Sequence, residues 1–200
     1  MQQLVNLAKK TVETFIEEGK IISPPEGLSE EFLKRKAGTF VTIEKNGNLR
    51  GCIGTYLPIR TNIAEEIIYN AIAAATEDWR FGPVQKEELP YLSYTVYILN
   101  EPELVMELDP VKWASPKIQR ILFDRVNPKK YGIIVKTVPI SPSGDVVFNG
   151  HFVAKTGLLL PDLEGIDTIE QQISIACQKA GIDPEREKIL IYKFTVEKYQ

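Results

Sequence analysis

The chain has little cysteine and histidine. Its 200 residues include two cysteines, Cys52 and Cys177, and one histidine, His151. The first residues read as an amphipathic helix and not as a signal peptide, so we expect a reduced, cytoplasmic protein without disulfides. A lone histidine leaves no His/Cys cluster for zinc, so no metal site is predicted.

Long apolar runs and an excess of one charge are also lacking. No run approaches the roughly 18 residues that span a membrane. Lys and Arg number 24 against 27 Asp and Glu, a net charge of −3. The balance argues against wholesale binding to nucleic acid or to an anionic membrane surface. The partners left open are a small molecule or another protein, and the sequence does not indicate an oligomeric state.

What is present is the pattern of a globular α+β protein. Apolar residues recur at helical spacing over 3–18, over 62–76 and from Asp167 to 180. Asn62 with Glu65 and Asp167 with Glu170 are predicted to cap the last two of these helices. The extended runs come in hairpins, and the last covers 190–196, which predicts a mainly antiparallel sheet with packed helices. No internal repeat is visible. The length suits a single domain over 1–200, with a possible smaller lobe within about 101–155.

The densest chemistry lies in the second strand of a predicted hairpin, Leu-Arg-Gly-Cys-Ile-Gly-Thr over 49–55. The preceding Asn46-Gly47 predicts a two-residue type I′ turn. In that register Lys45 faces Asn48, Ile43 faces Arg50 and Val41 faces Cys52, so Arg50, Cys52 and Gly54 share one face. Glycines inside a strand indicate a bulge or the close approach of another group.

Cys52 is the first catalytic candidate. The Arg50 guanidinium on the same predicted face would favour the thiolate and lower its pKa. The alternative is that Cys52 packs as a small buried hydrophobe. Glu77 and Asp78, in a turn with Arg80, are further acid–base candidates, although such a turn is more often solvated.

Arg50 itself allows two interpretations. An arginine on a half-apolar face needs either an anionic ligand or an internal carboxylate. The internal carboxylates expected from the sequence are Glu77 and Asp78. An open pocket at Arg50 would favour a ligand, and a sealed ion pair would favour a structural brace.

The motif over 49–55 resembles the hallmark of the AMMECR family, named for the Alport syndrome, mental retardation, midface hypoplasia and elliptocytosis chromosomal region. The resemblance extends to further stretches: Gly38–Val41, Asn70–Ala75, Asp78 with Arg80-Phe81, Glu88-Leu89-Pro90, Leu160-Pro161 and Gln178–Gly181. It implies an α+β fold with a larger and a smaller lobe and the hallmark strand near the cleft between them. It names no reaction or cofactor, but prokaryotic relatives occur with Memo-like and radical S-adenosylmethionine proteins. Trp79 departs from the small residue or proline usual in the family.

The first functional hypothesis is a cleft beside the motif that binds a small molecule or an anionic group. The predicted ligand-binding residues are Arg50, Gly51, Cys52, Gly54, Thr55, Asp78 and Arg80. The alternative is a non-enzymatic adaptor that presents this surface to a protein partner, for which a flat surface with exposed aromatics would argue. Whether the chain is an enzyme stays open.

Overall fold

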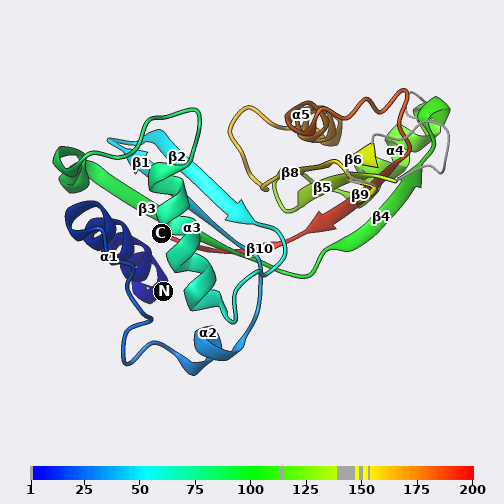
Figure 1. The fold of residues 1–200 in the computed structure, drawn as a ribbon. Coiled ribbons are helices and arrows are strands. Elements are labelled where there is room, and N and C mark those ends of the chain that lie inside the picture. Colours follow the sequence, from blue (N-terminus) through cyan, green and yellow to red (C-terminus); the bar gives the residue numbers. More distant parts are fainter. Residues whose placement is uncertain (1, 113–114, 139–146, 149–150, 153) are drawn as a thin grey trace. The chain divides into compact units, whose positions relative to one another are not determined.

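The computed structural model describes residues 2–112, 115–138, 147–148, 151–152 and 154–200. Within these residues the fold is α+β, with helices packed on two antiparallel four-stranded sheets (Figure 1). The predicted fold class is therefore confirmed. The chain divides into two compact units: unit 1 comprises the residues up to Asn100 together with Glu197–Gln200, and unit 2 comprises Glu101–Val196.

Unit 1 is built around a sheet with the strand order β10-β3-β1-β2. Its elements are α1 (Gln2–Glu18), α2 (Glu30–Lys34), β1 (Thr39–Lys45), β2 (Asn48–Thr55), α3 (Ile63–Thr76), the 3-10 helix η1 (Lys86–Tyr91), β3 (Leu92–Leu99) and β10 (Val196–Tyr199). Helices α1 and α3 share one core with one face of the sheet, in which Val41, Ile43 and Ile67 are fully buried. This packing fixes α3 directly behind the motif strand β2.

The local signals for the hairpin and for α3 are confirmed. Asn46 and Gly47 both have positive φ, 51° and 79°, as a type I′ turn requires. The Asn62 side chain accepts a hydrogen bond of 2.9 Å from the Glu65 N–H and caps the start of α3.

Unit 2 is built around a sheet with the order β4-β9-β5-β8. Its elements are β4 (Glu103–Leu108), the 3-10 helix η2 (Pro110–Lys112), α4 (Pro116–Arg125), β5 (Gly132–Thr137), β6 (Val147–Phe148), β7 (His151–Phe152), β8 (Thr156–Leu159), α5 (Ile169–Ala180) and β9 (Ile189–Phe194). This unit runs well past the predicted limit of 155, because β8, α5 and β9 belong to the same sheet and core. A turn predicted over 141–145 lies outside the described residues.

Two boundaries differ from the sequence prediction. The cap of α5 is Thr168, which exchanges hydrogen bonds with Gln171, so the predicted cap of Asp167 with Glu170 was one residue early. The strand predicted over 190–196 is two strands, since β9 ends at Phe194 and β10 begins at Val196 in the sheet of the other unit. Alternation of side chains continues through the break, so periodicity could not reveal the change of sheet.

The two units share one topology. In each, a hairpin is followed by a helix and a third strand, β1-β2-α3-β3 in unit 1 and β5-β8-α5-β9 in unit 2. The strand orders correspond position by position. The fourth strand of each sheet follows the third strand of the other unit, because β4 comes after β3 and β10 after β9. Unit 2 is thus one continuous segment, whereas unit 1 is completed by a strand from the C-terminal end of the chain.

Candidate functional site

The motif strand β2 carries a β-bulge that moves Arg50 out of the predicted register. Lys45 pairs with Asn48 as predicted, but the register shifts between Ile43 and Glu44, so Ile43 pairs with Gly51 and not with Arg50. Cys52 consequently faces Thr42 and not Val41. One extra residue on a bulged strand reverses the faces of all residues beyond it. The prediction that Arg50, Cys52 and Gly54 alternate along one regular face was therefore wrong.

Both motif glycines lie where a side chain would collide with the protein itself. A Cβ on Gly51 would lie 2.1 Å from the Ala74 carbonyl oxygen of α3. A Cβ on Gly54 would lie 2.3 Å from a ring carbon of Phe40. The close packing of α3 and of Phe40 gives these positions a structural reason to be glycine.

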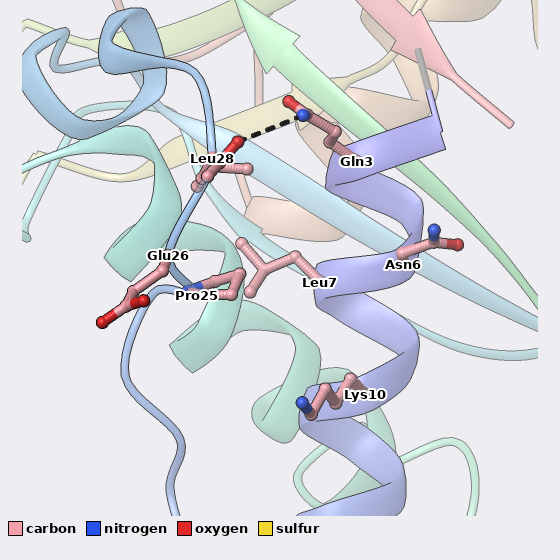
Figure 2. Close-up of a pocket in the computed structure, with 8 residues that line it drawn as sticks. Gln3, Asn6, Leu7, Lys10, Pro25, Glu26 and Leu28 are labelled. Carbon is pink, nitrogen blue, oxygen red and sulfur yellow. Dashed lines mark hydrogen bonds between the residues drawn. The ribbon is translucent and has the colours of Figure 1, made fainter.

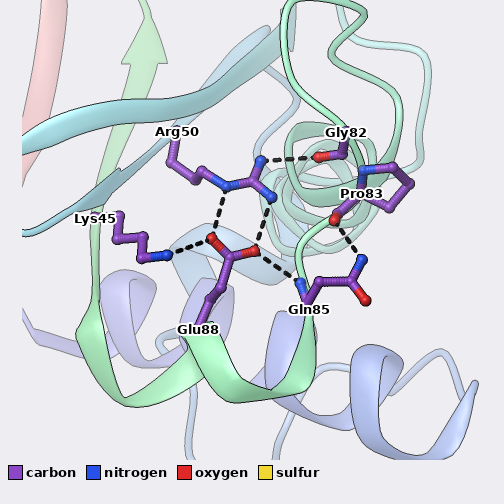
Figure 3. A network of polar contacts seen from close by, with 6 residues as sticks. All are labelled: Lys45, Arg50, Gly82, Pro83, Gln85 and Glu88. Atoms are coloured by element: carbon purple, nitrogen blue, oxygen red, sulfur yellow. Dashed lines mark hydrogen bonds and ion pairs between the residues drawn. The ribbon is translucent and has the colours of Figure 1, made fainter.

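Arg50 is held by a carboxylate that the sequence did not indicate, Glu88 of η1 (Figure 3). Its Nε and Nη2 donate to the two carboxylate oxygens at 3.0 and 2.8 Å, and its Nη1 donates to the Gly82 carbonyl at 2.9 Å. The same carboxylate accepts the Lys45 ammonium and the Gln85 N–H, both at 2.9 Å. The Arg50 and Glu88 side chains are only 15% and 14% exposed. The ion pair expected with Glu77 or Asp78 is thus made with Glu88, and the hydrogen bonds from Arg50 are the main cause that lowers the Glu88 pKa to about 2.

Asp78 forms a second ion pair beside the motif. Arg80 donates to its two oxygens at 2.9 and 2.6 Å, and the backbone N–H of Cys52 donates to it at 2.8 Å. Because β2 is an edge strand, this N–H would otherwise point away from the sheet without a strand partner. The Arg80 hydrogen bonds are the main cause that lowers the pKa of the buried Asp78 to about 2. Glu77 caps the C-terminal end of α3 through its backbone and is exposed.

The Cys52 thiol is half-buried beside these charges. The Thr42 hydroxyl donates to its Sγ at 3.3 Å. The pKa of Arg80 is raised mainly by the Asp78 hydrogen bonds, with a smaller contribution from the negative charge of Cys52. The Arg80 guanidinium is thus close enough to Cys52 for an electrostatic interaction. Cys177 is buried in the core of unit 2, and burial is the main cause that raises its pKa to about 11.

Trp79 projects from the turn that Asp78 and Arg80 hold. The Phe81 N–H donates to the Asp78 carbonyl at 2.9 Å and closes the turn. The guanidinium carbons of Arg80 and Arg50 lie 5.4 and 6.0 Å from the centre of the Phe81 ring. Trp79 is nevertheless 90% exposed. Aromatic residues usually pack, so the sequence did not distinguish this tryptophan; its one signal was the charge on each side of it.

Thr55, at the end of the motif, is fixed by two buried polar residues of α3 that sequence reasoning missed. Its hydroxyl donates to Glu66 at 2.6 Å. The Asn70 amide donates to the Thr39 carbonyl at 3.0 Å and to the Thr55 hydroxyl at 3.4 Å. Glu66 also accepts the N–H groups of the loop that follows β2. A carboxylate and an amide inside an otherwise apolar helical stripe were the available signal.

A pocket of about 200 Å³ in unit 1 lies apart from the motif (Figure 2). It is formed by α1 and the loop before α2, where the Gln3 amide donates to the Gly27 carbonyl at 3.3 Å. Leu7, Pro25 and Leu28 supply its apolar lining, and no motif residue contributes. In the described part of the chain, no helix is long and apolar enough to cross a membrane, and no three His, Cys, Asp or Glu side chains are grouped to hold a metal ion.

The fold and the braced hairpin define a class of protein: an α+β chain of two like units in which an arginine of the first hairpin is locked to an internal glutamate. The chain belongs to the AMMECR1 family, whose model matches residues 5–199. A Thermotoga maritima protein is 44% identical over 197 residues, covering 98% of this chain and 96% of its own length. A Clostridium acetobutylicum protein is 39% identical, but the match covers 35% of that longer chain. The crystal structure of an uncharacterized protein, PH0010 from Pyrococcus horikoshii, is similar with a TM-score of 0.75 and 32% identity, covering 98% of this chain and 88% of that one.

Proposed function

We propose that this chain is a non-enzymatic adaptor domain that binds a protein partner through the surface beside the Leu49–Thr55 motif, with Trp79 as the anchor. One observation carries the proposal. The charged groups around the motif are engaged in internal ion pairs, while the large apolar side chain held between Asp78 and Arg80 is almost fully exposed.

A rigidly held tryptophan is well suited to binding. Tryptophan and arginine are enriched among the interface residues that dominate binding energy. Because the ion pair on both sides of Trp79 fixes its backbone, less conformational entropy is lost when a partner covers the ring. Leu49, on the motif strand itself, is also exposed.

Small-molecule binding at Arg50 is the alternative, and it has weaker support. Every guanidinium nitrogen of Arg50 donates to Glu88 or to the Gly82 carbonyl, so an anionic ligand would have to displace Glu88. A catalytic role for Asp78 also has weak support. With a pKa of about 2 and four hydrogen bonds donated to it, Asp78 is poorly matched to proton transfer near neutral pH.

The Clostridium acetobutylicum relative supports association with other protein modules. The chain matches 35% of that protein, so the domain there is joined to a longer polypeptide. The Memo-like proteins that the family resemblance associates with such chains are the first candidate partners.

The test compares three versions of the full chain, purified from cells that naturally produce it and examined by native mass spectrometry. We expect the wild-type protein to carry a stoichiometric protein partner that Trp79→Ala loses and Phe123→Ala keeps, since Phe123 is an exposed aromatic of unit 2. The identified partner, with a purified Memo-like protein as the first candidate, is then titrated against each version. A bound small molecule that Arg50→Ala removes, with no protein partner, would instead support the ligand hypothesis.

A further inference from the structure

A second exposed apolar surface lies at the opposite end of α3 from Trp79. We call Leu57, Ile59, Arg60 and Tyr69 the α3 entry patch. Leu57 and Ile59 are 52% and 71% exposed and lie in the loop between β2 and α3, while Tyr69 is exposed on α3 itself. A helix of this length separates its two ends by about 20 Å, so the loop residues of the patch lie far from the Trp79 turn, with Tyr69 in the middle of α3.

The loop that carries the patch is held rigidly from beneath. The buried Glu66 carboxylate accepts the N–H groups of Ile59 and Arg60, both at 2.8 Å. The Thr61 hydroxyl donates to Glu65 at 2.6 Å. The exposed side chains therefore sit on a fixed backbone, which lowers the entropy that a partner must remove on binding.

The matching loop of unit 2 behaves differently. Between β8 and α5, Leu160 is buried, and Leu163 and Ile166 pack against the core. The shared topology therefore does not require apolar side chains to be exposed at this connection. Exposure of Leu57 and Ile59 is a specific property of unit 1, as expected of a contact surface.

Arg60 adds a charge with no carboxylate against it. Its guanidinium carbon lies 3.7 Å from the centre of the Tyr69 ring. Among the described residues no carboxylate forms an ion pair with Arg60, whereas Arg50 and Arg80 are paired with Glu88 and Asp78. A flat, exposed guanidinium stacked on an aromatic ring can donate hydrogen bonds to a partner carboxylate.

We propose that the α3 entry patch binds a segment of a partner protein in which an aspartate or glutamate side chain meets Arg60 and neighbouring apolar side chains cover Leu57 and Ile59. The acidic residue follows from charge complementarity with Arg60. Its apolar neighbours follow from the exposure of Leu57 and Ile59, since the centre of an interface is apolar. The site is a second contact surface, independent of the Trp79 surface.

The test uses a phage-displayed library of random peptides selected on the immobilised full chain. We expect enriched peptides that combine Asp or Glu with Leu, Ile or aromatic residues. Their binding should fall roughly tenfold or more in Ile59→Ser, the loss expected for a hot-spot residue. Phe123→Ser is the matched control, because Phe123 is also 71% exposed but belongs to unit 2. Selection on Arg60→Glu should enrich Lys or Arg in place of the acidic residue.

Three results would overturn the proposal. One is the absence of any enriched peptide, and another is peptides that bind wild type and Ile59→Ser equally. The third is a dimer in sedimentation velocity that Ile59→Ser abolishes, since the occupant would then be a second copy of this chain. Melting curves of all variants check that they fold, and Arg60→Glu tests the site even if Ile59→Ser does not. Trp79→Ala should leave peptide binding unchanged, which separates this result from the adaptor proposal.

Discussion

Arg50 places three nitrogen donors on two acceptors, Glu88 and the Gly82 carbonyl, in a largely buried setting. Removing one partner of a buried pair leaves the other charge uncompensated and costs about 3–5 kcal/mol. Lys45 would still contact Glu88 in Arg50→Ala, so we expect this variant to lower the free energy of unfolding by less than that, but by clearly more than about 1 kcal/mol, in urea melts. Arg50→Lys should retain part of the stability, since it keeps the charge but loses the planar fork.

An exposed ion pair supplies the control for Arg50. Arg186 lies 3.5 Å from Asp183 and its side chain is 87% exposed. Arg186→Ala should cost less than about 1 kcal/mol. If Arg50→Ala lost as little free energy of unfolding as Arg186→Ala, this result would contradict a structural role for Arg50. It would favour the hypothesis that Arg50 binds a ligand.

The two cysteines should differ in reactivity. Cys52 is half-buried and has the Arg80 cation near it, and reactive cysteines are typically partly exposed and close to a cation. Cys177 is buried and its pKa is raised to about 11. We expect iodoacetamide to alkylate Cys52 faster than Cys177 in the folded protein, as followed by mass spectrometry of the digested chain. Equal or reversed rates would remove the motive for thiol chemistry at the motif.

Acid should weaken both ion pairs beside the motif. The pKa of Glu88 and that of Asp78 are lowered to about 2 in the folded protein, from 4.5 and 3.8. Groups with lowered pKa stabilise the fold above their unfolded pKa, and that stability is lost as the pH falls toward the folded pKa. We expect the free energy of unfolding to fall between about pH 5 and pH 2. In Glu88→Gln, which is less stable at neutral pH, the same fall should be shallower; an unchanged slope would exclude Glu88 as a source of the acid sensitivity.

At the scale of elements, the motif arginine has a counterpart in unit 2. Lys155, just before β8, donates to both oxygens of Glu187 at 2.9 Å and to the Gly181 carbonyl at 2.8 Å. Glu187 also accepts the Asp183 N–H at 2.8 Å, as Glu88 accepts the Gln85 N–H. In both units, a cation at the second strand of the hairpin thus donates hydrogen bonds to two groups. One is a glutamate carboxylate near the third strand, and the other is the carbonyl of a glycine that follows the helix. The repetition marks the Arg50 brace as part of the architecture.

Close contact between strand and helix is repeated as well. A Cβ on Gly157 would lie 1.9 Å from the Ala176 carbonyl oxygen, much as Gly51 meets Ala74. Because backbone cannot yield without separating the helix from the sheet, we expect Gly51→Ala and Gly157→Ala to cost at least 1–3 kcal/mol, about the range for overpacking. Gly82→Ala, at a position with no atom within 4 Å of the added carbon, should stay within about 0.5 kcal/mol. Chemical denaturation measures the free energy of unfolding of the three variants. If Gly51→Ala is as stable as the wild type, α3 can shift away from the strand.

The sequence predicted those elements whose signals are local. The Asn46-Gly47 turn and the Asn62 cap depend on residues close in sequence, and both are present. The bulge at Arg50 depends on packing against α3, and the Glu88 brace depends on a residue 38 positions away, so neither had a local signal. The family resemblance identified the motif correctly but could not tell a ligand site from a brace.

For the whole molecule, the position of β10 in the first sheet makes unit 1 depend on residues far from it in sequence. In β10, Glu197 pairs with Arg35 at 2.7 Å, and the Gln200 amide donates to the Thr95 hydroxyl of β3 at 3.3 Å. We expect removal of Glu197–Gln200 to increase amide hydrogen exchange along β3, because that strand loses a hydrogen-bonded neighbour. Exchange in β5, which does not pair with β10, serves as the internal control. Unchanged protection of β3 would mean that β10 adds little to the sheet.

The sequence pattern alone did not reveal that β10 joins the first sheet. Alternation identified an extended stretch over 190–196 correctly, but a strand carries no mark of the sheet it joins. Likewise, the two units share topology without a sequence repeat that could be seen by inspection. Only the pairing of β10 with β3 and of β4 with β9 discloses both.

The position of β10 in the first sheet also sets an order for folding during translation. The ribosome makes the first three strands of unit 1 within the first hundred residues, but β10 is made only after all of β4 to β9. In unit 2 the strand β4 is synthesised first, so its sheet can be completed as soon as β9 emerges. Throughout that time β3 keeps an open edge on the nascent chain, exposed to wrong pairing or to a chaperone. The half of the molecule that is synthesised first is therefore the half that is finished last.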